Sequence, residues 1–547
     1  MTKDPYEGSD RVLTGVPIYV RADSEAVEAL GVVGGQVAAR GTLPDVRRAV
    51  GLDVPVRALA HGALLPAFVD AHQHGVLVAL DPHTDTLYRA ADDIAGLMHV
   101  VSQHCAETGD GWLRLHGYEP MALTERRSPT ARELDGVCPE RPVHVISRTY
   151  HESVVNTAGL DALRISSTTP DPPGGRIVRN RRGRPTGVLL EAASFLAEQS
   201  SRPPFDLAAV ETRLDGYARR LLASGITRIG DAAVPADLAD WYVAAMARRG
   251  ISVQPMLVGD RIDEPHIRTG STAKVLADGG EYCHLCMSGR QVARIFAASS
   301  RAMLGAEAST ARAVGRRSGF PLREGDGRWH TGIRFPEEVE LPALMNAAAE
   351  AGAGLAIHAV GNGAVDAVLA ALTARPDLAG FLPVRIEHAM VLDPRLVDGI
   401  AAAGVPVVAQ PGFLSAYGHD LEVVPVPQPL SLMPFRTMLE AGVPVAFSSD
   451  FPAAGLSPWS AVADAMARPD GRGGHIHPDE SLTARQAIRA YTSTAAEVTG
   501  LSNGGTLEVG SPADMQWVDA DPFTNTDPRR LTVLGVWSSG IQVYAGR

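Results

Sequence analysis

Two histidines separated by one residue, His72 and His74, follow an apolar run at 63–71. Side chains alternate faces along a β-strand, so both imidazoles would point the same way from the end of such a strand. Two neutral imidazoles on one side of a strand can hold one cation. The alternative is that two polar residues simply close a strand. Ligand-type residues at the ends of later apolar runs favour the metal interpretation.

Four of those later runs each carry one such residue: Lys274, His358, His388 and Asp450. A single buried histidine is more often a hydrogen-bonded core residue than a ligand. A single lysine is often a surface residue at the start of a loop. The recurrence of these types at successive strand ends is hard to explain in that way. The set of four histidines, one aspartate and one lysine therefore predicts a metal centre.

The elements that must position these residues follow a repeating pattern. A helix predicted at 207–223 precedes a strand at 226–231. The same order recurs with helices at 341–351, 396–403 and 435–441 before strands at 354–358, 405–410 and 443–450. This helix–glycine–strand repeat is typical of a parallel α/β fold, and at this length it favours a β/α barrel. Active sites of such barrels lie at the carboxyl ends of the strands, where the candidate ligands stand.

Two regions depart from this alternation. Residues 85–205 fit it poorly, and we expect them to form a long insertion after the first barrel strand, over the barrel mouth. The chain ends, at about 11–56 and 515–544, consist of short apolar runs broken by glycines. Such runs are typical of short strands, and we expect the two ends to pair into one small β-domain.

Composition narrows the classes of function. The chain has 547 residues, is 45% hydrophobic and carries a net charge of −12 without long charged blocks. Nothing in it favours nucleic acid or a membrane surface as a partner. The start has no apolar signal core, and no run approaches the ~20 apolar residues of a membrane span. The four cysteines are too few for a disulfide framework, so we expect a soluble protein of the reducing cytoplasm.

Several segments together resemble the amidohydrolase superfamily, and within it the amidohydrolase 3, or YtcJ-like, family of metal-dependent hydrolases. The matching segments are LPAFVDAHQH at 65–74, KVLADG at 274–279, HAVGNGAVD at 358–366, RIEHA at 385–389, QP at 410–411 and SDFP at 449–452. Further matches lie at 150–156, 173–177, 185–191 and 505–514. The resemblance covers nearly the whole chain.

This resemblance implies a (β/α)8 barrel that carries a β-sandwich built from both chain ends. We expect the sandwich at 1–64 and 491–547, and the barrel at 65–490 with its insertion at about 85–205. The resemblance also implies that His72 and His74 hold the more buried metal with Asp450. His358 and His388 would hold a second metal, and Lys274 would bridge the two as a carbamate.

The implied activity is hydrolysis of a carbon–nitrogen bond other than a peptide bond, in an amide such as an N-acyl or N-formyl amine. Asp450 would accept a proton from a metal-activated water and pass it to the leaving nitrogen. His151 matches a further family histidine and would hold the developing oxyanion, although a packing role is nearly as plausible. Zinc suits the histidine-rich set, while manganese, iron or cobalt stay open, as does a count of one or two metals.

Other functions stay open on the sequence alone. A cyclic-amide hydrolase or a deaminase would use the same metal site, and a metal-dependent isomerase or lyase is a further possibility. A non-catalytic barrel is disfavoured because all six ligand positions are filled. The substrate is a small amide-type molecule that the sequence does not identify, and a homo-oligomer stays open. Plausible pocket residues besides His151 are Trp112, Tyr118, Tyr282, His330 and Tyr417.

Two features depart from the family pattern. Asn362 stands where the family usually has aspartate, a change expected to alter charge near the metal site without removing it. The segment at 282–287 also diverges and contains Cys283 and Cys286. Their spacing suits a metal, but no second pair supplies the other ligands of a structural zinc site, so free thiols are expected.

Overall fold

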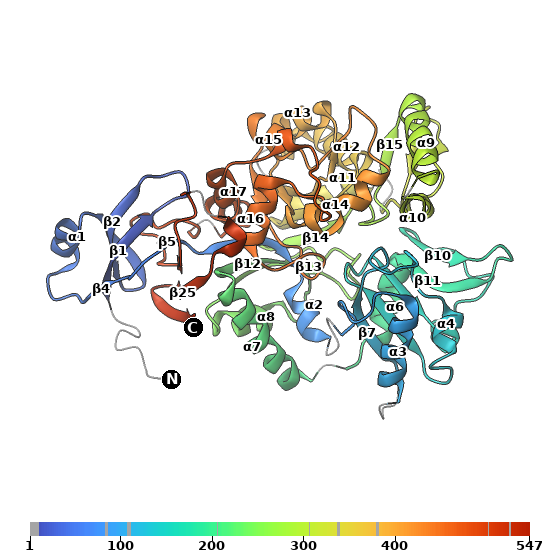
Figure 1. Ribbon diagram of the computed structural model, residues 1–547, viewed down its shortest axis with the longest axis horizontal. Coiled ribbons are helices and arrows are strands. Elements are labelled where there is room, and N and C mark those ends of the chain that lie inside the picture. Colours follow the sequence, from blue (N-terminus) through green and yellow to red (C-terminus); the bar gives the residue numbers. More distant parts are fainter. Residues whose placement is uncertain are drawn as a thin grey trace.

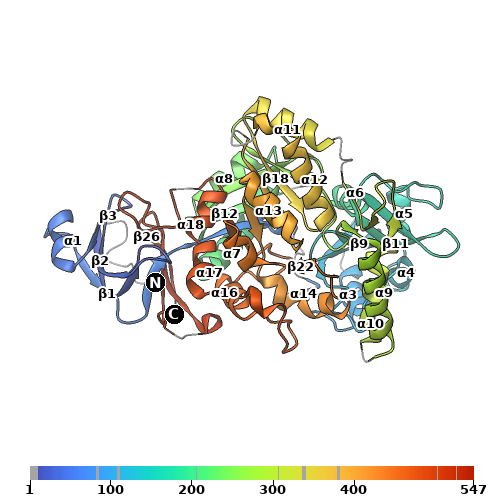
Figure 2. The same cartoon turned by 90° about the horizontal axis from the view of Figure 1, so that it is seen from above.

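The computed structural model describes residues 10–81, 86–106, 111–204, 206–305, 307–335, 340–378, 382–501, 503–524 and 527–546. The molecule is elongated, with a barrel in the middle and one smaller β-rich unit at each end (Figures 1 and 2). Among the described residues we find no helix with the length and hydropathy needed to cross a membrane.

Eight parallel strands form the central sheet, in the order β23-β21-β19-β18-β14-β13-β12-β6. Their bounds are β6 Phe68–Gln73, β12 Ile226–Pro235, β13 Ser252–Val258, β14 Thr272–Leu276, β18 Gly354–Ala359, β19 Val384–His388, β21 Val407–Ala409 and β23 Val445–Phe447. The first and last strands of this order also contact each other. The sheet therefore curls into a nearly closed barrel, which confirms the predicted α/β class.

Helices that precede the barrel strands cover the outside of the sheet (Figure 1). They include α7 Leu207–Ala223, α11 Glu340–Ala351, α13 Pro394–Ala403 and α15 Phe435–Glu440, close to the predicted bounds. In α7, Val210, Leu214 and Leu221 are buried on one face, as the helical period requires. In α13, Asp393 caps the first turn and Gly404 ends the helix in the left-handed conformation. Local sequence therefore sets where these helices begin and end.

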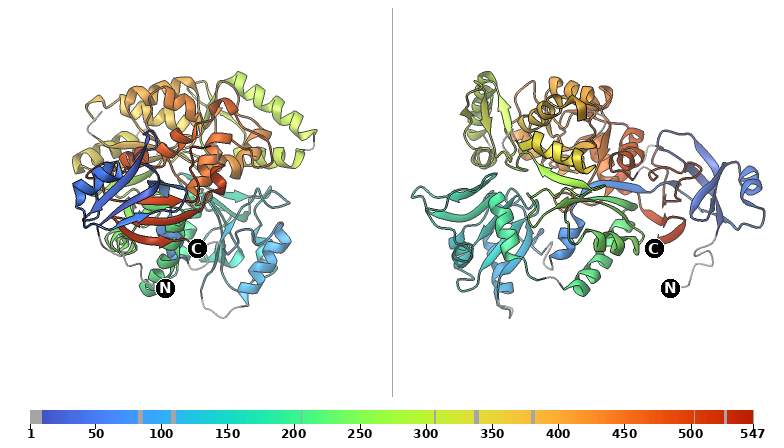
Figure 3. Two further views of the ribbon diagram at one scale, coloured as in Figure 1. Left: turned by 60° about the vertical axis from the view of Figure 1, so that its left-hand side comes forward. Right: turned by 180° about the vertical axis from the view of Figure 1, so that it is seen from behind.

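The two chain ends form one sheet, in the order β26-β25-β24-β5-β1-β2-β3, with β4 beside β1. The bounds are β1 Arg11–Tyr19, β2 Ala26–Val33, β3 Gln36–Gly41, β4 Val56–Ala58, β5 Ala63–Pro66, β24 Met515–Val518, β25 Val533–Ser538 and β26 Ile541–Ala545. Blue N-terminal and red C-terminal strands lie together in Figure 3. Leu64 of β5 pairs with Trp517 of β24, so the expected pairing of the two ends is confirmed.

A five-stranded sheet lies at the opposite end of the molecule from the sheet of the chain ends (Figure 1). Its strands are β7 Leu113–Tyr118, β8 Val143–Ser147, β9 Glu152–Val155, β10 Gly175–Arg179 and β11 Pro185–Glu191. Helices α3 Ile94–Cys105, α4 Ala131–Asp135 and α6 Ala192–Ser201 contact it. This unit falls between β6 and β12 in the chain, and it brings His151, just before β9, to the barrel.

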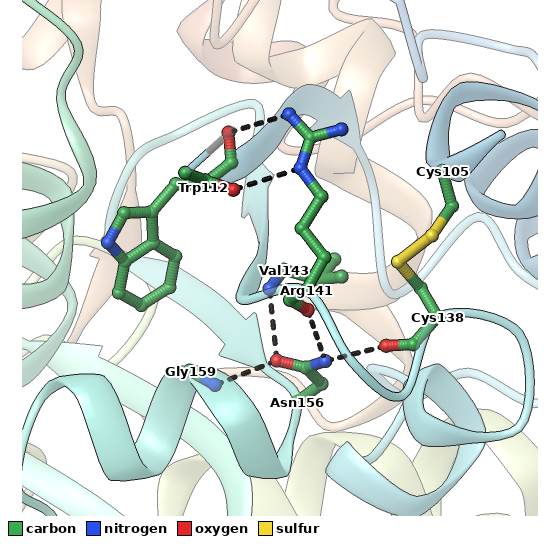
Figure 4. Close-up of a disulfide and its surroundings, with 8 residues drawn as sticks. Cys105, Trp112, Cys138, Arg141, Val143, Asn156 and Gly159 are labelled. Carbon is green, nitrogen blue, oxygen red and sulfur yellow. Dashed lines mark hydrogen bonds between the residues drawn. A yellow bond between two sulfur atoms is a disulfide. The ribbon is translucent and has the colours of Figure 1, made fainter. Parts of the chain in front are cut away.

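A disulfide joins Cys105, at the end of α3, to Cys138, after α4. Figure 4 shows the bridge beside Asn156, whose amide nitrogen donates to the carbonyl of Cys138 at 2.8 Å. The oxygen of the same amide accepts from the backbone of Val143 and Gly159. The expectation of a reducing environment did not anticipate this bridge. Cys283 and Cys286 are free thiols, as expected.

A second insertion, which the sequence pattern did not reveal, lies between β14 and β18. It comprises β15 Leu285–Met287, α9 Gly289–Met303, α10 Ala308–Ser318, β16 Leu322–Arg323 and β17 Trp329–Thr331. The three strands form a sheet in the order β15-β17-β16. Both helices lie at the same end of the molecule as the five-stranded sheet (Figures 1 and 2).

Candidate metal centre

The six residues predicted as metal ligands come together at the carboxyl ends of the barrel strands. They line one pocket: His72, His74, Lys274, His358, His388 and Asp450. His388 and Asp450 both have positive φ angles, 77° and 50°. Non-glycine residues rarely adopt this conformation, and it concentrates at functional sites. Local backbone strain therefore accompanies the placement of two of the six side chains.

The side chains of His72, His74 and Asp450 lie close enough together to bind one ion. Oδ1 of Asp450 lies 3.4 Å from Nε2 of His72 and 3.1 Å from Nε2 of His74. One ligand atom from each residue lies within 4.8 Å of those of the other two. The rings of His358 and His388 lie next to this group, with centroids 4.5 Å apart. The predicted HxH pair and the distant aspartate thus meet in space.

Hydrogen bonds on the outer side of the imidazoles determine which nitrogen faces the pocket. Nδ1 of His72 lies 2.5 Å from a carboxylate oxygen of Glu387, and Nδ1 of His74 lies 2.9 Å from the carbonyl oxygen of Ala232. Nδ1 of His388 lies 2.9 Å from the side-chain oxygen of Gln410. Because these partners only accept, each Nδ1 carries the proton, and the Nε2 lone pair is left for a metal.

The electrostatics of this group fit a cation. Lone pairs of His72 and His74 face the Asp450 carboxylate, an arrangement that is repulsive unless a positive charge lies between them. Burial lowers the pKa of His72 well below its usual value, so the imidazole is neutral. Among the described residues, Oδ1 of Asp450 and Nε2 of His358 accept no hydrogen bond.

Lys274 lies inside this group rather than on the surface. Its side chain is buried in β14, and its Nζ lies 3.3 Å from Nε2 of His72. Burial lowers its pKa to about 8, against the opposing effect of Glu387 and Asp450. This position excludes the alternative of a surface lysine that begins a loop.

His151 reaches the same pocket from the first insertion. Its Nδ1 lies 2.6 Å from a carboxylate oxygen of Glu191, which is fully buried at the end of β11. Burial by itself lowers the pKa of His151, but the charge and hydrogen bond of Glu191 outweigh it and raise that pKa. The ring lies 5.3 Å from that of His358. His151 is thus placed as a charged donor beside the candidate ligands.

The remaining pocket wall was not predicted, because most of it comes from loops and insertions. It is formed by Leu77, Arg148, Thr149, Tyr150, Phe195, Ile262, Leu276 and Ala453. Five residues proposed from the sequence do not line it: Trp112, Tyr118, Tyr282, His330 and Tyr417. The hydroxyl of Tyr282 binds Glu152 and that of Tyr417 binds the carbonyl of Ala453, so both rings are used to hold loops together.

The side chain of Asn362 binds the backbone of β15 rather than a candidate metal ligand. Its side-chain oxygen accepts from the backbone nitrogen of Cys286 at 3.0 Å, and its amide nitrogen donates to the Cys286 carbonyl at 2.8 Å. Asparagine offers both a donor and an acceptor, whereas an ionised aspartate only accepts. The departure from the family pattern therefore accompanies a specific clamp on β15.

Comparison with known proteins agrees with this geometry. A model described as the amidohydrolase family matches residues 56–544. The chain is 31% identical over 542 residues to the N-substituted formamide deformylase of Arthrobacter pascens, with 96% of each protein covered. Its fold is similar to two solved uncharacterized metal-dependent hydrolases. The one from Pyrococcus horikoshii has a TM-score of 0.67 and 19% identity, covering 95% of this chain and 99% of that one. The one from Pyrococcus furiosus has a TM-score of 0.65 and 21% identity, covering 94% and 100%.

Proposed function

Because this chain belongs to the amidohydrolase family, and so hydrolyses carbon–nitrogen bonds other than peptide bonds with a divalent metal, we propose that it acts on N-substituted formamides. The products would be formate and an amine. One observation carries this proposal: the pocket that holds the convergent ligand atoms also contains four buried apolar side chains. These are Leu77, Phe195, Ile262 and Leu276. An apolar substituent on the amide nitrogen would pack against them.

In this proposal His72, His74 and Asp450 would hold one ion. His358 and His388 would hold a second, and Lys274 would bridge the two as a carbamate formed with carbon dioxide. The Nε2 lone pairs that face the pocket support the histidine assignments, and the burial of Lys274 beside His72 supports the bridge. We propose zinc as the metal, because imidazole and carboxylate donors suit it.

A divalent ion bound here would supply a Lewis acid and lower the pKa of a bound water toward neutrality. Asp450 would accept a proton from the attacking water and deliver it to the amide nitrogen as the carbon–nitrogen bond breaks. His151 would donate to the carbonyl oxygen as negative charge develops there. Glu191 keeps His151 charged and fixes its ring, so the donor is ready before the substrate binds.

The test is formate release from N-benzylformamide by the zinc-loaded enzyme, followed with a formate-specific assay. N-benzylacetamide, which yields the same amine, is the matched substrate, and Asp450→Asn is the matched variant. We expect formate from the formamide, much slower hydrolysis of the acetamide, and loss of activity in the variant. If a panel of aliphatic and aromatic N-substituted formamides yields no formate with the loaded enzyme, the proposed substrate class is wrong.

A further inference from the structure

A second cluster of ligand-type side chains lies on the three-stranded sheet of the second insertion. Cys286 of β15 and His330 of β17 are directly opposed in the antiparallel pair. Opposed residues place their side chains on the same face of a sheet, with Cβ atoms roughly 5 Å apart. Asp326 lies in the turn that joins β16 to β17. None of the three residues lines the catalytic pocket.

The three ligand atoms converge as they do around a small cation. Sγ of Cys286 lies 3.9 Å from Nε2 of His330, and the same nitrogen lies 3.0 Å from Oδ2 of Asp326. One ligand atom from each residue lies within 4.8 Å of those of the other two. Tetrahedral zinc would place the sulfur and nitrogen about 3.6 Å apart, and the nitrogen and oxygen about 3.4 Å apart. The sulfur–nitrogen and nitrogen–oxygen distances differ from these values by a few tenths of an ångström, and the sulfur lies within 4.8 Å of a carboxylate oxygen of Asp326.

Each of the three residues is held in place by a neighbour. Asn362 clamps the backbone of Cys286, and the backbone nitrogen of Arg328 donates to Oδ1 of Asp326 at 2.8 Å. Nδ1 of His330 lies 2.8 Å from Nε2 of His284. The Nε2 of a neutral His284 ring can accept the Nδ1 proton of His330. The lone pair on Nε2 of His330 is then directed toward Cys286 and Asp326.

We propose that Cys286, Asp326 and His330 bind a divalent transition-metal ion at a site separate from the catalytic centre. One sulfur, one nitrogen and one oxygen donor suit zinc or cobalt. Glu324, whose Oε2 lies 4.0 Å from Nε2 of His330, or a water would take the fourth position. Asp326 is exposed and gives the ion a path from solvent. Binding forms a metal–thiolate bond and releases the thiol proton of Cys286 to solvent.

Such an ion would stabilise the backbone segments that connect the second insertion to the catalytic pocket. It would tie the β16–β17 turn to β15, which follows His284 in the chain. The backbone nitrogen of His284 donates to Asp278, and the same carboxylate accepts from the backbone of Val360 and Gly361. Those two residues follow His358 at the end of β18. We therefore assign a structural role to the ion at Cys286, Asp326 and His330.

The test is a cobalt titration of the purified full-length enzyme, followed by absorption. A cysteine ligand produces a thiolate-to-cobalt charge-transfer band in the near ultraviolet, and the proposed catalytic ligands include no cysteine. Cys105 and Cys138 are joined to each other, which leaves Cys283 and Cys286 as the free thiols. We expect a band whose final intensity corresponds to one cobalt–thiolate bond per chain, whatever amount of cobalt the catalytic pocket also takes up. It should disappear in Cys286→Ser and persist in the matched control Cys283→Ser.

A second measurement protects the test against a variant that fails to fold. Elemental mass spectrometry of zinc-loaded His330→Gln should show one metal fewer per chain than the wild type, with the catalytic metal retained. The wild-type titration needs no variant at all. Absence of the charge-transfer band at saturating cobalt would overturn the proposal, and so would a band of unchanged intensity in Cys286→Ser. Either result leaves the catalytic proposal untouched, because that rests on other residues.

Discussion

A carboxylate oxygen of Glu387 lies 2.5 Å from Nδ1 of His72, and both side chains are fully buried. The other oxygen of Glu387 accepts from Nε of Arg385 at 2.6 Å, which fixes the carboxylate plane. Glu387 therefore sets both the tautomer and the orientation of His72. A partner of this kind raises the basicity of the imidazole and improves it as a metal ligand.

Replacement of Glu387 by alanine should weaken metal binding by about 10- to 100-fold, because His72 loses the acceptor that holds its proton on Nδ1. Glu387→Gln keeps an acceptor and should lose less. Competition with a chelator of known zinc affinity measures both effects. Equal metal affinity in the wild type and Glu387→Ala would show that His72 is not a ligand held in this way.

Replacement of His151 by alanine should lower kcat by about 10²- to 10³-fold, the usual cost of removing one oxyanion donor. The metal content should stay unchanged, because His151 stands beside the proposed ligands and is not one of them. Glu191→Gln should give a smaller loss of kcat, since the imidazole of His151 remains but its protonated form is less favoured. If metal content falls together with kcat in His151→Ala, His151 has a role in metal binding instead.

Activation of metal-free enzyme by zinc and bicarbonate should depend on pH through Lys274. Only the neutral amine reacts with carbon dioxide, and the buried Lys274 has a pKa lowered to about 8. The neutral fraction is about one tenth at pH 7 and about nine tenths at pH 9, so at a constant concentration of dissolved carbon dioxide the activation rate should rise by nearly tenfold. Lys274→Ala should show no response to bicarbonate. A wild-type rate that is flat over this range would argue against the carbamate.

Loss of the Cys105–Cys138 bridge should destabilise the first insertion. The bridge spans 33 residues, and restriction of the unfolded chain over that length stabilises the fold by at most about 4 kcal/mol. Cys105→Ser combined with Cys138→Ser should lower Tm. Addition of a reductant should lower the Tm of the wild type but not that of the double variant. Titration of free thiols after denaturation should find two per chain. Four titratable thiols would show that the bridge is absent in the purified protein.

Replacement of Asn362 by aspartate should lower the free energy of unfolding by about 1–3 kcal/mol. The carboxylate cannot donate to the Cys286 carbonyl, so a buried acceptor loses its partner and faces another oxygen. Urea unfolding of the two proteins measures the difference. Equal or greater stability of Asn362→Asp would mean that the backbone of β15 finds another donor.

Much of the barrel and all six candidate ligands could be predicted from the sequence. Each barrel helix buries one face, and each following strand is a short apolar run, so α7 and β12 are visible as a local period. In a parallel barrel the strand ends meet on one face, whatever their separation along the chain. His72 and Asp450 could therefore be placed together although 378 positions separate them. The helices α9 and α10 escaped prediction because an amphipathic helix in an insertion has the same period as one on a barrel.

The sequence by itself thus determined the barrel elements and the strand ends that carry the candidate ligands, because local periodicity encodes both. Only the tertiary structure decided which side chains support them. Glu387 binds His72 and Glu191 binds His151 across 315 and 40 positions, and the Cys286–His330 pair depends on the register of β15 and β17. Register and the packing of one element on another follow from how complete surfaces fit together, and no single stretch of sequence carries that information.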